Sequence, residues 1–154
     1  MKTVQEYINQ LENGRELYIT TVQKIIHYEE KITKHWTVHD VCAHIILIYE
    51  RFIFQGIKRA VQGKNQRSIP KSFLNLGNML WTKWYARKIK SEQLIARFLT
   101  VHSQVVDYVS TLTEKELRSK VRLSNGQQMS IGEMVEAHCN HVHHHIEQLK
   151  KGAY

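Results

Sequence analysis

The chain has very few of the residues that make turns. Its 154 residues include one proline and seven glycines, eight residues or about 5%, against a usual share of about 12%. A protein of many short strands needs such residues at each reversal, so this scarcity argues against a β-sandwich or barrel. Low-complexity tracts are also missing, which argues against disorder. The predicted fold class is therefore all-α.

Cysteine and long apolar runs are scarce as well. Two cysteines cannot build a disulfide framework, and they fit a reducing compartment. The longest apolar run, residues 41–49, is interrupted by His44 and is too short to span a membrane. Residues 1–6 lack the apolar region of a signal peptide. We expect a cytoplasmic protein with no membrane partner.

Acidic residues are absent from one long stretch of the chain. Between Arg51 and Ser91 there are ten Lys and Arg residues and no Asp or Glu. The rest of the chain holds 22 − 10 = 12 basic and 14 acidic residues. The net charge of +8 is therefore a regional property.

Apolar residues at three- and four-residue spacing predict four long helices in a single domain, residues 1–154. Capping-box patterns at Thr37–Asp40 and at Ser130–Glu133 mark two helix starts. A loop over 63–71 contains the only proline, and 121–128 reads as a turn or small hairpin. The predicted helices cover residues 3–32, 37–61, 73–112 (in two pieces, the second from 91) and 131–150.

Histidines cluster on the last predicted helix. At about 100° per residue, His138, His141 and His145 fall within about 60° of one another on a face that also carries Met134. Burying several imidazoles without partners is costly, and a metal ion supplies partners. His141 and His145, at i and i+4, can bind one ion from one helix.

A third ligand would come from another helix, and His44 lies in an otherwise apolar stretch. Three histidines and a water leave an open coordination position, as in catalytic zinc sites. The alternative is that His44 is a hydrogen-bonded core residue. Asp40, four residues earlier, is spaced to orient its ring. Cys42 and Cys139 precede histidines by two residues, a spacing that does not share a helix face, so we read them as buried thiols.

Two motifs resemble those of a known family. Residues 36–45 read WTVHDVCAHI and residues 140–148 read NHVHHHIEQ. They resemble the opening of the second helix and the C-terminal motif of the DinB/YfiT-like superfamily. The resemblance covers essentially the whole chain and implies a four-helix bundle holding a divalent metal, usually Zn or Ni. By motif position the implied ligands are His44, His141 and His145, and the second-shell or pocket candidates are His138, Asp40 and Gln148.

The resemblance also implies a class of activity. The superfamily includes thiol-dependent transferases and isomerases and metal-dependent hydrolases. We therefore expect an S-transferase or hydrolase acting on a small molecule, with a low-molecular-weight thiol as co-substrate, and a homodimer. The alternative is a non-catalytic binding protein for a stress compound or toxin, as in the related ClbS/DfsB-like proteins.

The basic stretch is interleaved with aromatic residues at Trp81, Trp84 and Tyr85. Four interpretations are open: nucleic-acid binding, a membrane-surface helix, a rim that attracts an anionic substrate, or a solvated basic face whose aromatics turn into the core. We favour the solvated basic face. Nucleic-acid binding ranks lowest of the four, because no recognition signature accompanies the charge.

Overall fold

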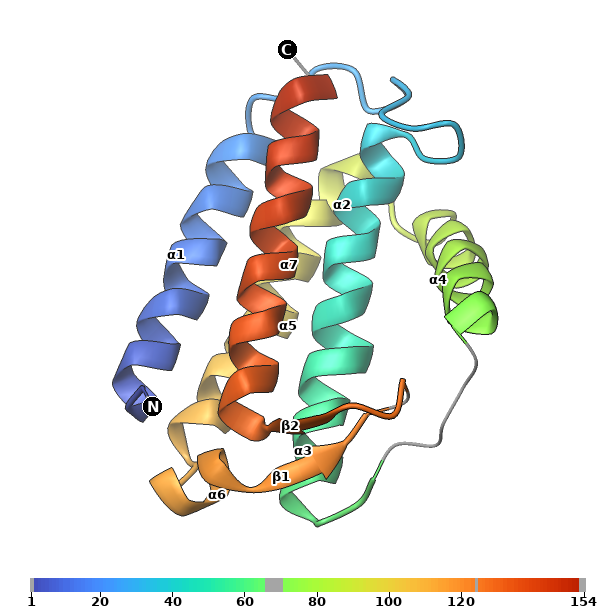
Figure 1. Ribbon diagram of the computed structural model, residues 1–154. Coiled ribbons are helices and arrows are strands. Elements are labelled where there is room, and N and C mark those ends of the chain that lie inside the picture. The colour runs from blue at the N-terminus through green and yellow to red at the C-terminus, as the bar shows by residue number, and fades with distance from the viewer. Residues whose placement is uncertain (1, 66–70, 124, 153–154) are drawn as a thin grey trace.

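A computed structural model describes residues 2–65, 71–123 and 125–152. Four long helical segments run side by side and form a bundle (Figure 1), which confirms the predicted fold class. The second of them passes without a break through a π-helical segment. The four are α1 (Val4–Val22), α2 (Val38–Leu47) continued by the π-helix (Ile48–Phe54) and α3 (Gln55–Val61), α5 (Leu94–Ser110) and α7 (Ile131–Gly152).

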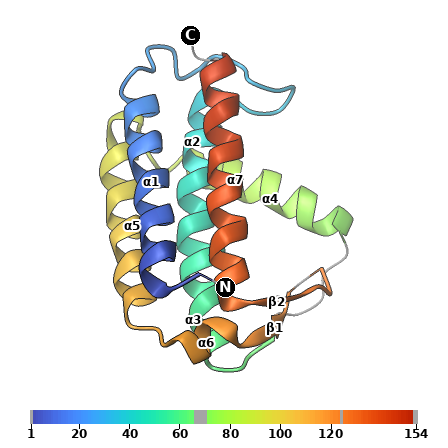
Figure 2. The same cartoon turned by 60° about the vertical axis from the view of Figure 1, so that its left-hand side comes forward.

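The first and last helices of the chain run in the same direction. α1 packs against both α5 and α7, and α2 packs against α5 and α7 from the other side (Figures 1 and 2). α2 and α5 run opposite to α1 and α7. The apolar faces meet between the four segments, where Tyr18 stacks on Phe98 with ring centroids 4.0 Å apart. This arrangement brings the start of α2 beside the C-terminal half of α7.

Smaller elements surround the bundle. α4 (Lys71–Ala86) runs across the outside of α2, with its C-terminal end against the bundle and its N-terminal end projecting from it (Figure 2). A 3₁₀ turn (Ser91–Gln93) precedes α5. α6 (Glu114–Arg118) precedes an antiparallel hairpin of β1 (Lys120–Arg122) and β2 (Gln128–Ser130). Gly126 has a φ of +86° in its turn, a conformation that suits glycine. The predicted hairpin is confirmed.

The end of the first predicted helix is wrong. α1 ends at Val22 instead of residue 32, and the following chain folds back over the start of α2. Backbone N–H groups of Val38 and His39 donate to the carbonyls of Glu30 and Tyr28 at 2.8 and 2.9 Å. The loop thus satisfies donors that a helix N-terminus leaves unpaired. Ile25 and Ile26 continued the helical spacing, but Ile26 is 80% exposed.

Both predicted capping boxes are present. The Thr37 hydroxyl accepts from the backbone N–H of Asp40, whose carboxylate accepts from the backbone N–H of Thr37 at 2.8 Å. Ser130 and Glu133 make the same pair of contacts before α7. The predicted proline-containing loop falls largely on residues 66–70, outside the described residues. Within the described ranges, no helix has the length and apolarity needed to cross a membrane.

Candidate metal centre

Three histidines from two helices converge at the contact between α2 and α7. His44 lies on α2, and His141 and His145 lie one turn apart on α7. Each offers a ring nitrogen, and these three nitrogens all lie within 4.8 Å of one another. His44 and His145 are buried and His141 is partly exposed. Helical spacing within α7 and the packing of α2 on it therefore bring together the residues that the sequence predicted.

Hydrogen bonds orient two of the three rings. The Nδ1–H of His145 donates to Oε1 of Gln148 at 2.8 Å, because a side-chain carbonyl oxygen can only accept. This leaves Nε2 of His145 unprotonated, and it lies 3.1 Å from Nε2 of His141. Nδ1 of His44 lies 2.9 Å from the hydroxyl of Thr82 on α4. With Nδ1 of His145 and Nδ1 of His44 engaged in these contacts, Nε2 is the other ring nitrogen of each that remains for the cluster.

The three imidazoles are held in their neutral form. Burial, the larger cause, and the neighbouring imidazoles, the smaller one, lower the pKa of His44 to about 3 and that of His141 to about 4. Burial also lowers the pKa of His145. Neutral imidazole is the form that binds metal ions. At neutral pH all three side chains can therefore act as ligands without first losing a proton.

The donor set fits a divalent ion. Two Zn–N bonds of about 2.0–2.1 Å at a tetrahedral angle place their nitrogens about 3.3 Å apart. The separation of 3.1 Å between His141 and His145 is close to that value, and His44 supplies a third nitrogen. Imidazole nitrogens suit Zn, Ni, Cu and Fe alike.

An indole ring lies against the centre. Trp36, in the loop before α2, has its ring centroid 4.6 Å from that of His44 and 6.0 Å from that of His145. The indole packs against the His44 ring and supplies an apolar wall beside the cluster. Trp36 belongs to the motif quoted above, but its spacing alone gave it no role.

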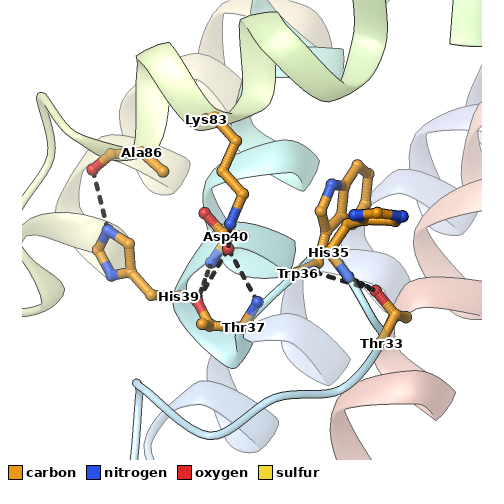
Figure 3. A network of polar contacts seen from close by, with 8 residues as sticks. All are labelled: Thr33, His35, Trp36, Thr37, His39, Asp40, Lys83 and Ala86. Atoms are coloured by element: carbon orange, nitrogen blue, oxygen red, sulfur yellow. Dashed lines mark hydrogen bonds and ion pairs between the residues drawn. The ribbon is translucent and has the colours of Figure 1, made fainter. Parts of the chain in front are cut away.

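The other predicted site residues lie as follows. Gln148 contacts His145, as a second-shell residue would. Among the described residues, the Asp40 carboxylate makes no hydrogen bond with the His44 ring: it accepts from Thr37 and forms an ion pair with Lys83 (Figure 3). Thr82 takes the position beside His44 that the spacing had suggested for Asp40.

His138 is fully buried on the same helix. Among the described residues, neither of its ring nitrogens has a hydrogen-bond partner. Its ring meets that of Tyr49 edge-on at 4.3 Å. It is not among the three residues whose nitrogens converge.

The expectation that the aromatics of the basic stretch turn into the core is wrong for both tryptophans. Trp81 and Trp84 are 57% and 53% exposed, whereas Tyr85 is buried. The Lys88 ammonium lies over the Trp84 ring, 3.5 Å from its centroid. The reason is that α4 packs on α2 with one face, which carries Thr82 and Tyr85.

Sequence reasoning missed Thr82 and Lys83. Both lie in the basic and aromatic stretch, where no motif or periodicity separated them from their neighbours. A buried threonine on a helix ordinarily signals nothing beyond packing. Only the packing of α4 on α2 reveals their roles.

The fold and the histidine cluster together define a helical-bundle protein with three neutral imidazoles gathered at one point. The model of the DinB superfamily matches residues 10–149. The chain therefore belongs to the DinB superfamily.

Solved structures share the fold. YfiT from Bacillus subtilis, a candidate metal-dependent hydrolase with an unusual four-helix bundle topology, is similar with a TM-score of 0.76 and 15% identity, over 96% of this chain and 84% of YfiT. A mycothiol-dependent maleylpyruvate isomerase is similar with a TM-score of 0.75 and 13% identity over 96% of this chain, which spans 61% of that protein. At these identities the likeness concerns the fold alone. No curated protein gives a significant match.

Proposed function

We propose that this protein is a divalent-metal-dependent enzyme that acts on a small molecule, by transfer to or from a low-molecular-weight thiol or by hydrolysis. The observation that carries the proposal is the convergence of the three neutral imidazoles of His44, His141 and His145. The two structural neighbours support it, one by its candidate metal-dependent hydrolysis and one by its mycothiol dependence. Zn or Ni is the expected metal.

The residues at the centre have different roles in the proposed function. His44, His141 and His145 would hold the ion, with Gln148 fixing the tautomer of His145. Such an ion supplies Lewis acidity that brings the pKa of a water or thiol toward neutrality. Trp36 would cover one side of the His44 ring with its half-buried indole. An anionic substrate and a homodimer stay predictions.

Elemental analysis of untagged protein tests the metal centre. We expect about one equivalent of Zn or Ni per chain in the native protein, as three-histidine sites hold one ion. His145→Ala should lose it, because the two remaining nitrogens lie on different helices. His143→Ala is the matched control, since His143 is exposed on the same helix. Native protein with no more metal than His145→Ala would contradict the proposal.

A thiol-conjugation assay separates an enzyme from a non-catalytic binding protein. The metal-loaded protein is incubated with a model electrophile and either bacillithiol or mycothiol, and hydrolysis of an activated ester is followed in parallel. Turnover that His44→Ala abolishes and His143→Ala preserves supports the enzyme. Stoichiometric binding of the electrophile without turnover by either route supports the binding protein.

A further inference from the structure

Thr82 reaches the metal centre from outside the bundle. It lies on α4, which crosses α2 on the outside of the bundle (Figure 2), and its side chain is fully buried. Its hydroxyl is 2.9 Å from Nδ1 of His44. It is the polar partner of His44 among the described residues. The contact joins a helix that supplies no ligand to one that supplies a ligand.

The neighbouring residue fastens α4 to the first turn of α2. Lys83 forms an ion pair with Asp40, and the same carboxylate caps α2 through Thr37 (Figure 3). His39, the residue before Asp40, makes two further contacts. Its Nε2 lies 3.1 Å from the carbonyl oxygen of Ala86, and its Nδ1 lies 3.2 Å from the hydroxyl of Ser91. The register of α4 on α2, and with it the position of Thr82, is therefore set by side chains four and five residues before His44.

The chemistry of a neutral imidazole makes this contact decisive. Such a ring carries one proton, on either Nδ1 or Nε2. If Nδ1–H of His44 donates to the Thr82 hydroxyl, the lone pair of Nε2 is left for the cluster. If the hydroxyl donates instead, the proton sits on Nε2 and blocks it. Trp36 packs on the same ring, so the His44 ring has little room to turn over and exchange the positions of its two nitrogens.

We propose that Thr82 is a positioning residue that accepts the Nδ1–H of His44, fixing the tautomer that leaves Nε2 free for a metal ion. Lys83 and Asp40 hold α4 in the register that this contact needs. The metal part rests on the proposed function, whereas the tautomer is a property of the chain itself. Partners of this kind typically change metal affinity by about 10–100-fold.

The first measurement is the tautomer of His44 in metal-free protein, read from the ¹⁵N shifts of its ring. We expect the Nδ1–H form in the native chain. In Thr82→Val, which keeps the shape but removes the acceptor, we expect a mixture of both forms. Thr82→Ser should restore the native form. The native measurement needs no variant, so it stands even if Thr82→Val fails to fold.

The second measurement is zinc affinity by competition with a chromophoric chelator. Thr82→Val should weaken binding at least about tenfold, and Thr82→Ser should stay close to native. Thr100→Val, the same change on the exposed face of α5, is the matched control. Thermal unfolding of the metal-free variants checks that the fold is retained.

The outcomes separate the two proposals. An Nε2–H tautomer in the native chain, or native zinc affinity in folded Thr82→Val, overturns the role of Thr82. If the native chain binds no zinc or nickel, the proposed function fails. In that case the ring shifts still decide whether Thr82 sets the tautomer of His44.

Discussion

His138 occupies the core as a neutral aromatic ring. Burial lowers its pKa well below the ordinary value, and the imidazoles of His141 and His102 lower it further. Its two nitrogens have no partner among the described residues, and its ring packs edge-on against Tyr49. A buried polar group without a partner costs free energy of folding. An apolar residue of similar size should therefore be tolerated here.

We expect His138→Leu to be as stable as the native chain, or more stable, at neutral pH. Because the pKa is depressed in the folded state, the unfolded chain takes up a proton below about pH 6.5 while the folded chain does not. Proton uptake by the unfolded chain alone therefore lowers the stability of the native protein as the pH falls below that value, and has no effect above it. Urea unfolding of His138→Leu between pH 7 and 5 should thus show a shallower decline.

The exposed His143→Leu is the control and should keep the native decline. A loss of more than about 2 kcal/mol in His138→Leu at pH 7 would be typical of a broken polar network and would contradict this interpretation of the residue.

Gly132, unlike His138, lies where its environment admits no larger side chain without displacement of a neighbour. It lies in the first turn of α7, and a Cβ there would lie 2.8 Å from Cζ of Tyr7 and closer still to the hydroxyl oxygen, so this buried ring would have to shift. We expect Gly132→Ala to lose about 1–3 kcal/mol of unfolding free energy, the usual cost of overpacking. Thermal or urea unfolding measures it. Gly77→Ala, where no atom lies within 4 Å of the new Cβ, should be neutral or stabilising.

At the scale of elements, the start of α2 is the junction on which the site depends. One carboxylate, that of Asp40, both caps α2 and pairs with Lys83 on α4. Burial raises the pKa of Asp40, but the hydrogen bonds from Lys83 and Thr37 outweigh it and lower the pKa below 3.8. The charged carboxylate therefore stabilises the fold, and its protonation weakens two helix contacts at once.

We expect Asp40→Asn to cost about 1 kcal/mol at neutral pH, because it removes the negative charge from the first turn of α2 and from the pair with Lys83. The pair's share is small, since the Lys83 side chain is 38% exposed and the pair is screened. A depressed pKa contributes stability above the unfolded value, near pH 4, and this is lost as the pH falls below it. The difference between native and variant should therefore shrink below pH 4. Lys83→Met, which keeps the cap, should cost less. An Asp40→Asn variant equal to the native chain at pH 7 would refute this account.

At the scale of the whole molecule, the centre ties together helices from the two ends of the sequence. His44 is on α2 and His141 and His145 are on α7, so an ion bound to all three would join segments that separate on unfolding. A ligand that binds only the folded chain stabilises it by about 2.7 kcal/mol at 100 times its Kd. For a chain of this length that corresponds to a rise in Tm of about 5–10 °C.

Thermal unfolding with and without zinc, and after treatment with a chelator, measures this rise. We expect the native chain to show it and His145→Ala to show little of it. His143→Ala should respond as the native chain does. An equal rise in His145→Ala would locate the stabilising ion elsewhere.

The sequence by itself determined the features that are local along the chain. Scarce glycine and proline and the apolar spacing predicted the helices, and the capping boxes predicted two of their starts, because these signals act between residues a few positions apart. The i, i+4 spacing put His141 and His145 on one face for the same reason. His44 was predicted as the third ligand because it is a histidine within an otherwise apolar stretch.

The tertiary structure alone decided what depends on packing between distant segments. The chain after Val22 leaves the helix because the start of α2 needs carbonyl partners. Thr82 became the neighbour of His44, and Asp40 the partner of Lys83, because α4 packs on α2 in one register. Trp81 and Trp84 stay exposed because α4 has a single packed face. None of these features follows from helical periodicity, since each depends on contacts between residues that lie well beyond one helical turn of each other in the chain.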